Sequence, residues 1–209
     1  MGVIEALTLA MGTAWTSGIN LYATIAALGL AMNAGLINLP PELQVLANPV
    51  VIAVACVMYA VEFFTDKIPY LDNGWDVIHT FIRIPAGALL AAGAVGEVNQ
   101  ALELSAFLAG GTMAATAHVT KTTARLAVNV SPEPISNIVT SVGEDAAVLG
   151  GLWLIFEHPL VMIAALVLFV GFAIWFIPKM LSLAKRGFRS LRAKWRGGPR
   201  VGGSAIAPL

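Results

Sequence analysis

Five apolar stretches constrain the fold of this chain more than any other feature of its sequence. A helix needs about 20 predominantly apolar residues to cross a hydrocarbon core of about 30 Å, because lipid leaves no partner for an exposed backbone. Of the 209 residues, 58% are hydrophobic and only 11% are charged, which excludes an ordinary soluble domain. The stretches predict an all-α, polytopic membrane protein; they are 21–39, 50–64, 77–95, 135–156 and 160–177.

The basic residues gather at the C-terminal end. Eight of the 12 Lys and Arg residues lie from Lys179 onward, where there is no acid, so that 12 − 8 = 4 basic residues face 12 acidic ones over 1–178. The positive-inside rule therefore predicts a cytoplasmic C-terminus. Within 179–200, Leu, Phe and Trp alternate with Lys and Arg, which is typical of a helix lying on anionic lipid headgroups. Nucleic-acid binding is the less favoured alternative, because this segment follows a membrane span directly.

The two halves of the chain resemble one another. An ungapped comparison at an offset of 92 places 3–41 beside 95–133. More positions are identical than oily composition alone predicts, so we expect a tandem repeat. The identical pairs are Val3/Val95, Glu5/Glu97, Ala14/Ala106, Gly18/Gly110, Ala23/Ala115, Thr24/Thr116 and Pro40/Pro132.

Each half then predicts three crossings, and its first long segment is interrupted by small and polar residues at 16–20 or 109–112. An odd number of crossings inverts the second half, which gives about six transmembrane helices in two inverted repeats and cytoplasmic termini at both ends. The interrupted segments are tilted helices, an interfacial helix plus a span, or re-entrant hairpins; full helical pairs would instead make the repeat parallel. The predicted units are 1–95, 96–178 and a basic tail, 179–209.

The first half gathers its scarce charge after the span 50–64. The sequence KIP is predicted to end that helix, since the residue before proline disfavours the α region. Beyond it, polar residues recur at helical spacing and so share one face. The candidate ligands of this half are Glu62, Asp66, Lys67, Asp72, Asp76, His79 and Arg83.

A matching polar face is predicted in the second half. His118, Lys121 and Arg125 are spaced i, i+3 and i+7, and a row of cations in a membrane helix is costly unless it faces protein, water or an anion. The next span offers partners. The further candidates of this half are Asn129, Asn137, Glu144 and Asp145.

Three chemistries compete for these residues. The cations, with the helix breaks at Asn20 and Thr112, could hold an anion such as phosphate or a carboxylate. The carboxylates and histidines could relay protons or a cation coupled to transport. A divalent metal on Asp72, Asp76 and His79 is a weaker candidate, because no HExxH or CxxC motif is present. No other cofactor is indicated.

Two blocks carry a resemblance to a known family: EFFTDKIPYLDNGWDVIHTFIRIPAGALLAAGA and AHVTKTTARLAVNVSPEPISNIVTSVGEDA. They resemble the signature blocks of a family of bacterial multi-pass membrane proteins catalogued as a domain of unknown function, over 5–178. This resemblance implies residence in the bacterial inner membrane and names no substrate.

We therefore expect a small transporter or channel-like protein for an anion or a phosphate-bearing lipid headgroup, with carboxylates and histidines as coupling groups. One alternative is a structural or assembly factor whose buried charges lock the helices together. A second is a membrane enzyme or divalent-metal transporter, which is less favoured because no GxSxG or Walker loop is present. The expected partners are the bilayer, anionic headgroups, a small solute or ion, and a second copy of the chain.

Overall fold

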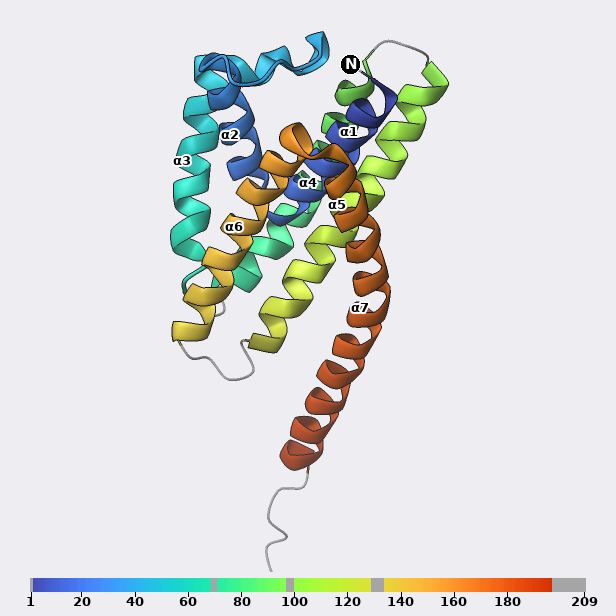
Figure 1. The fold of residues 1–209 in the computed structure, drawn as a ribbon. Helices are drawn as coiled ribbons and strands as arrows, with labels where there is room; N and C mark the ends of the chain where they lie inside the picture. Colours follow the sequence, from blue (N-terminus) through green and yellow to red (C-terminus); the bar gives the residue numbers. More distant parts are fainter. Residues whose placement is uncertain (1, 69–70, 97–99, 129–133, 197–209) are drawn as a thin grey trace, which may run out of the picture.

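The computed structural model describes residues 2–68, 71–96, 100–128 and 134–196, without the side chains of 72, 73, 134 and 183–196. The described chain is all-α, as predicted (Figure 1). Its elements are α1 (Val3–Ile19), α2 (Leu21–Asn33), the 3₁₀ helix η1 (Pro41–Ala47), α3 (Pro49–Thr65), α4 (Leu71–Val95), α5 (Gln100–Val128), α6 (Pro134–Glu157) and α7 (Pro159–Arg196).

Local sequence signals explain where these helices begin and end. The side chains of Asn20 and Asn48 cap α2 and α3 by accepting bonds from backbone N–H groups of the first turns. Gly35 and Gly96 follow the ends of α2 and α4 with φ of 71° and 67°, the left-handed conformation that stops a helix. The predicted break at KIP is confirmed, since α3 ends at Thr65.

The first interrupted segment is a helical hairpin, made of α1 and α2. α1 runs from the end of the bundle marked N toward its middle, and α2 returns to the same end (Figure 1). Contacts place both ends of the hairpin near the junction of α6 and α7. On α1, Thr8 Oγ1 lies 3.5 Å from the carbonyl oxygen of Pro159, and Ile37, after α2, lines the same pocket as Phe156 at the end of α6. The stretch 21–39 was one of the expected crossings, but only Leu21–Asn33 is helical, and this helix is too short to count among the candidate spans. The helix α2 has 13 residues, or about 20 Å at 1.5 Å per residue.

The prediction of a second interrupted helix at 109–112 is wrong. α5 is one helix of 29 residues through this stretch. Gly110 and Gly111 instead allow close packing: a Cβ atom on Gly110 would overlap Ala91, and one on Gly111 would press on Ala88. Glycine serves helix contact here and does not break the helix.

Small residues hold the centre of the bundle together. α1, α4 and α5 pack against one another, with α4 and α5 forming the most extensive contact. Gly18 lies against Ala114, and Gly87 lies between Ala114 and Ser17. Close approach of helix backbones through such residues is the usual basis of packing in membranes, where apolar burial supplies little driving force.

Three of the described helices are long and apolar enough to cross a membrane: Gly74–Val95 in α4, Ile135–Glu157 in α6 and Pro159–Ser182 in α7. A fourth is counted if η1 and α3, which meet at a bend of 64°, act as one span. α5 is equally long but less apolar. The start of α1 and the far end of α7 lie at opposite ends of the bundle, because α1 and α2 together do not cross it (Figure 1).

Candidate functional site

A network of seven charged side chains lies inside the bundle, at the tip of the hairpin formed by α1 and α2. Arg83 and Glu144 lie near the middle of α4 and α6, and Asp76 lies near the start of α4. The other members come from α5 and from the C-terminal end of α3. The predicted polar faces of the two halves therefore meet. The charge network comprises Glu62, Asp66, Asp76, Arg83, Lys121, Arg125 and Glu144.

Arg83 joins α4 to α3. One terminal nitrogen of its guanidinium lies 2.5 Å from Glu62 Oε1, and the other lies 3.0 Å from Asp76 Oδ1. Neither Arg83 nor Glu62 has any exposed side-chain surface. Ion pairs shielded from water in this way hold their geometry, but each charge depends on its partner to offset the cost of desolvation.

His118 extends this pairing to α5 as a neutral acceptor. Its Nδ1 lies 3.1 Å from a terminal nitrogen of Arg83, which can only donate a hydrogen bond. The proton of the imidazole is therefore on Nε2, which lies 2.7 Å from Thr80 Oγ1. Thr80 in turn donates to the carbonyl oxygen of Asp76.

Lys121 occupies the centre of the network. Its Nζ lies 3.3 Å from Glu62 Oε1, 3.2 Å from Asp66 Oδ2 and 3.4 Å from Glu144 Oε2. It also donates to the carbonyl oxygen of Ile19, the last residue of α1, at 3.2 Å. A cation at a helix C-terminus is favourable because the free carbonyl groups carry partial negative charge. The hairpin tip is thus bound to the network directly.

Arg125 holds Glu144 through two parallel bonds, from Nε to Oε1 at 2.9 Å and from Nη2 to Oε2 at 2.6 Å. The same guanidinium donates to the backbone carbonyl oxygen of Asp66 at 2.8 Å and to its carboxylate at 3.1 Å. This fork geometry is the one by which arginine recognises carboxylates and phosphates.

The other side of the tip binds Asp145. Asn20 accepts a hydrogen bond from the backbone N–H of Ala23 and donates through Nδ2 to Asp145 Oδ1 at 3.3 Å. Tyr59 donates to Asp145 Oδ2 at 3.2 Å. Asp145 therefore faces the N-terminal end of α2, where the helix dipole favours negative charge.

His79 lies beside the network and takes no part in its ion pairs. Its Nδ1 lies 2.8 Å from the carbonyl oxygen of Trp75 and its Nε2 3.1 Å from the hydroxyl of Tyr22, so the ring is satisfied by neutral partners. The described residues contain no group of three His, Cys, Asp or Glu that could hold a metal ion. Asp72, the third weak metal candidate, has a side chain outside that description.

The remaining predicted residues are scattered. Lys67 donates to the carbonyl oxygen of Phe63, and partial burial lowers the pKa of its ammonium while the nearby carboxylates of Asp145 and Asp66 oppose that shift. Thr112 is exposed on α5, where its hydroxyl bonds the same helix. Asn137 is buried on α6. The prediction for Asn129 lies outside the described residues.

Sequence reasoning missed three side chains that complete the site. Tyr22, Tyr59 and Thr80 each bond a residue that was predicted, yet none lies in a charged motif. The one available signal was position, since Tyr22 follows the break at Asn20 by two residues and Thr80 follows His79.

The network carries an excess of negative charge. Its four carboxylates oppose three cations, which gives 3 − 4 = −1. One oxygen on each of Glu62, Asp66 and Asp76 is buried with no hydrogen-bond donor among the described residues. Buried polar atoms are nearly always paired, so these oxygens leave acceptor capacity for a proton or water.

A pocket of about 270 Å³ connects the network to the outside of the bundle. Its wall includes Lys121 and Thr120 of α5, Glu144 and Gly143 of α6, and Phe169 of α7. Glu144 has 14% of its side chain exposed, whereas the other six network members have 4% or less. Of the network members, Lys121 and Glu144 line this pocket, and Glu144 is the more exposed of the two.

No curated protein and no solved structure matches this chain. A family model does match, over residues 7–179, a range that covers the hairpin, the charge network and the apolar part of α7. The family is described as a domain of unknown function, DUF4126. The chain belongs to the DUF4126 family.

Proposed function

We propose that this protein is a membrane transporter for an anion, either a small free anion or the phosphate group of a lipid, and that a proton is its coupling ion. The observation that carries the proposal is the fork between Arg125 and Glu144, because Glu144 lines a pocket. Glu144 occupies the position on Arg125 that a phosphate or carboxylate of a ligand would take.

Protonation of Glu144 would let the anionic group of a ligand replace its carboxylate on Arg125. A protonated Glu144 loses its charge and most of its attraction for Arg125 and Lys121, and an incoming anion then replaces it on the same donors. Release of the proton restores the internal pair and expels the anion. Each cycle would move one proton with one anion, which makes Glu144 the coupling group and Arg125 and Lys121 the binding groups.

The hairpin supports a transport role. α1 ends and α2 begins at the network, so that a helix C-terminus contacts Lys121 and a helix N-terminus faces Asp145. Broken helices with ends at mid-depth are a recurrent feature of ion and solute sites in transporters. The two inverted repeats and six crossings stay predictions, and the halves differ at their first helix.

We place the protein in the bacterial inner membrane, with the basic end of α7 in the cytoplasm, because of the positive-inside rule. Because α1 begins at the end of the bundle opposite to the far end of α7, the start of α1 would then lie on the other side of the membrane. Anionic headgroups would bind the tail 179–200.

A structural lock is the second candidate, because every cation of the network is paired with a carboxylate. The excess carboxylate and the three oxygens without a donor favour transport, since a lock is most stable when each buried charge and acceptor is satisfied.

Equilibrium binding of inorganic phosphate to the purified protein tests the proposal. We expect phosphate to bind at pH 5.5 and to bind at least about tenfold more weakly at pH 8, where Glu144 competes for Arg125. The variant Arg125→Met should bind at neither pH. Equal binding at both pH values, or binding that survives Arg125→Met, would reject the exchange.

A further inference from the structure

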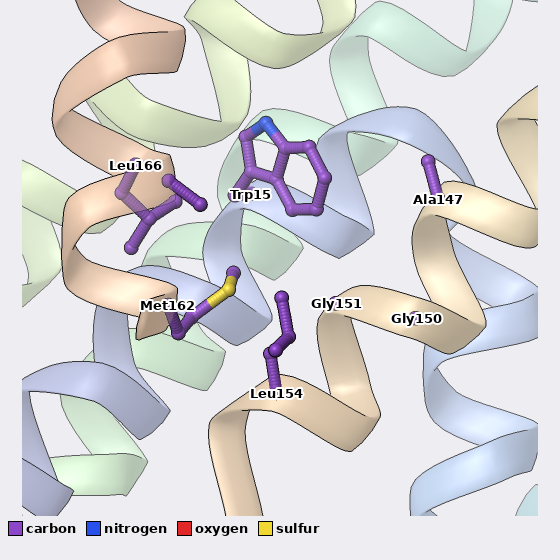
Figure 2. Close-up of a pocket in the computed structure, with 8 residues that line it drawn as sticks. Trp15, Ala147, Gly150, Gly151, Leu154, Met162 and Leu166 are labelled. Atoms are coloured by element: carbon purple, nitrogen blue, oxygen red, sulfur yellow. The ribbon is translucent and has the colours of Figure 1, made fainter. Parts of the chain in front are cut away.

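A second pocket extends the site along the bundle. This chain pocket, of about 280 Å³, lies between α6 and α7 and is walled by Gly150 and Gly151 on one side and Met162 and Leu166 on the other, with Trp15 of α1 between them (Figure 2). The described lining offers almost only apolar surface. Such a pocket suits hydrocarbon and gives a small polar solute nothing to bind.

The chain pocket adjoins the pocket at the charge network. Ala147 lines both pockets. Trp15, a wall of the chain pocket, packs edge-on against Phe169, a wall of the network pocket, with ring centroids 5.6 Å apart. The pocket that Lys121 and Glu144 line therefore lies next to the apolar pocket between α6 and α7.

The wall between the two pockets offers a hydrogen-bond donor. The indole nitrogen of Trp15 is buried and has no acceptor among the residues that the structure describes. A buried donor normally finds a partner, and an ester or phosphate oxygen at this wall would supply one. Figure 2 shows the indole nitrogen at the edge of the ring, away from Leu154.

From these contacts we infer that the substrate is an anionic amphiphile, with its phosphate or carboxylate at Arg125 and Lys121 and its hydrocarbon chain in the pocket between α6 and α7. This inference rests on the proposed function and narrows it, because a free anion would leave the chain pocket unused. The charge of the network pocket and the apolar lining of the chain pocket match the two ends of one such molecule.

Three helical glycines provide a matched set of variants. A Cβ atom on Gly143, Gly150 or Gly171 would meet no atom within 4 Å, so leucine can be introduced at each without a clash at that atom. Gly150 lines the chain pocket and Gly143 lines the network pocket. Gly171 on α7 is exposed and is the control.

Binding of dodecyl phosphate and of inorganic phosphate at pH 5.5 is measured in phosphatidylcholine nanodiscs, after subtraction of empty discs. Gly150→Leu should weaken the binding of dodecyl phosphate at least about tenfold, because the leucine displaces several methylene groups from the apolar pocket, and should leave the binding of inorganic phosphate unchanged. Gly143→Leu should weaken both probes, and Gly171→Leu neither.

If Gly150→Leu binds dodecyl phosphate as the wild type does while Gly143→Leu weakens both probes, the chain site is rejected and the anion site stands. Nonspecific lipid occupancy predicts the same loss from Gly171→Leu as from Gly150→Leu, and that result also overturns the inference. If Gly143→Leu weakens the binding of neither probe, both this inference and the proposed function are rejected.

Discussion

Glu144 binds Arg125 through both carboxylate oxygens, at 2.9 and 2.6 Å, in the geometry by which an arginine would hold a phosphate. The pair closes the network on the side that faces a pocket. An internal anion therefore occupies the arginine in the structure, and the predictions below follow from removing, replacing or isolating that anion.

Replacing Glu144 by glutamine should separate anion binding from pH. Glu144→Gln keeps the size of the side chain, removes its charge and brings the network from −1 to 0, so that Arg125 is available at every pH. Phosphate binding should rise at pH 8 to the level seen at pH 5.5, as measured by equilibrium dialysis. The exchange would be wrong if the variant kept the pH profile of the wild type.

Removing both partners should separate transport from stability. Arg125→Met alone leaves Asp66 and Glu144 short of a buried cation and should cost about 3–5 kcal/mol of unfolding free energy. The double variant Arg125→Met with Glu144→Met should recover much of that loss, because two apolar side chains of similar volume pack together and leave no buried charge without a partner between them. Thermal unfolding in detergent and phosphate uptake are then compared.

The double variant should unfold near the wild-type temperature and transport nothing. If the network is purely a structural lock, the wild type shows no phosphate uptake for the double variant to lose. Uptake by the wild type that persists in the double variant would also exclude Arg125 as a binding group.

Loss of the cap at Asn20 should cost more than loss of an equivalent cap elsewhere. Asn20 and Asn48 each cap a helix, but only Asn20 is buried and bonded to Asp145. Asn48→Ala should cost about 1 kcal/mol. Asn20→Ala should cost about 1–3 kcal/mol more, because Asp145 also loses a donor. Equal unfolding midpoints for the two variants would show that the bond from Asn20 to Asp145 of α6 does not stabilise the hairpin tip.

The close contact of α1 with α5 should tolerate no added methyl group. In Gly18→Ala the new Cβ atom would overlap the carbonyl oxygen of Ala114, a backbone atom that cannot turn aside. We expect a loss of about 1–3 kcal/mol in chemical unfolding. Gly171→Ala, which meets open space, should instead gain up to about 1 kcal/mol from helix propensity.

Helical spacing was sufficient to place several site residues on common faces. Asp76 and Arg83, seven residues apart, do meet on one side of α4, and His118 and Arg125, also seven apart, are both buried on α5. The contact between these faces depends on how α4 and α5 pack. Periodicity within a segment carries no information on that packing.

Glycine was the source of the main error. The stretches at 16–20 and 109–112 both combine glycine with polar residues, yet α1 ends at Ile19 and α5 continues. Gly110 fits against Ala91 within an unbroken helix, whereas Asn20 caps a new one. Glycine allows both outcomes, and the neighbouring helix selects between them.

Proton movement with the anion tests the central claim most directly. The wild type and Glu144→Gln are reconstituted in phosphatidylcholine vesicles that contain a pH-sensitive dye, and phosphate or dodecyl phosphate is added outside. We predict that the lumen of wild-type vesicles acidifies as the anion enters, and that Glu144→Gln vesicles take up the anion without acidification. Anion uptake by the wild type with no change in lumenal pH would contradict the account.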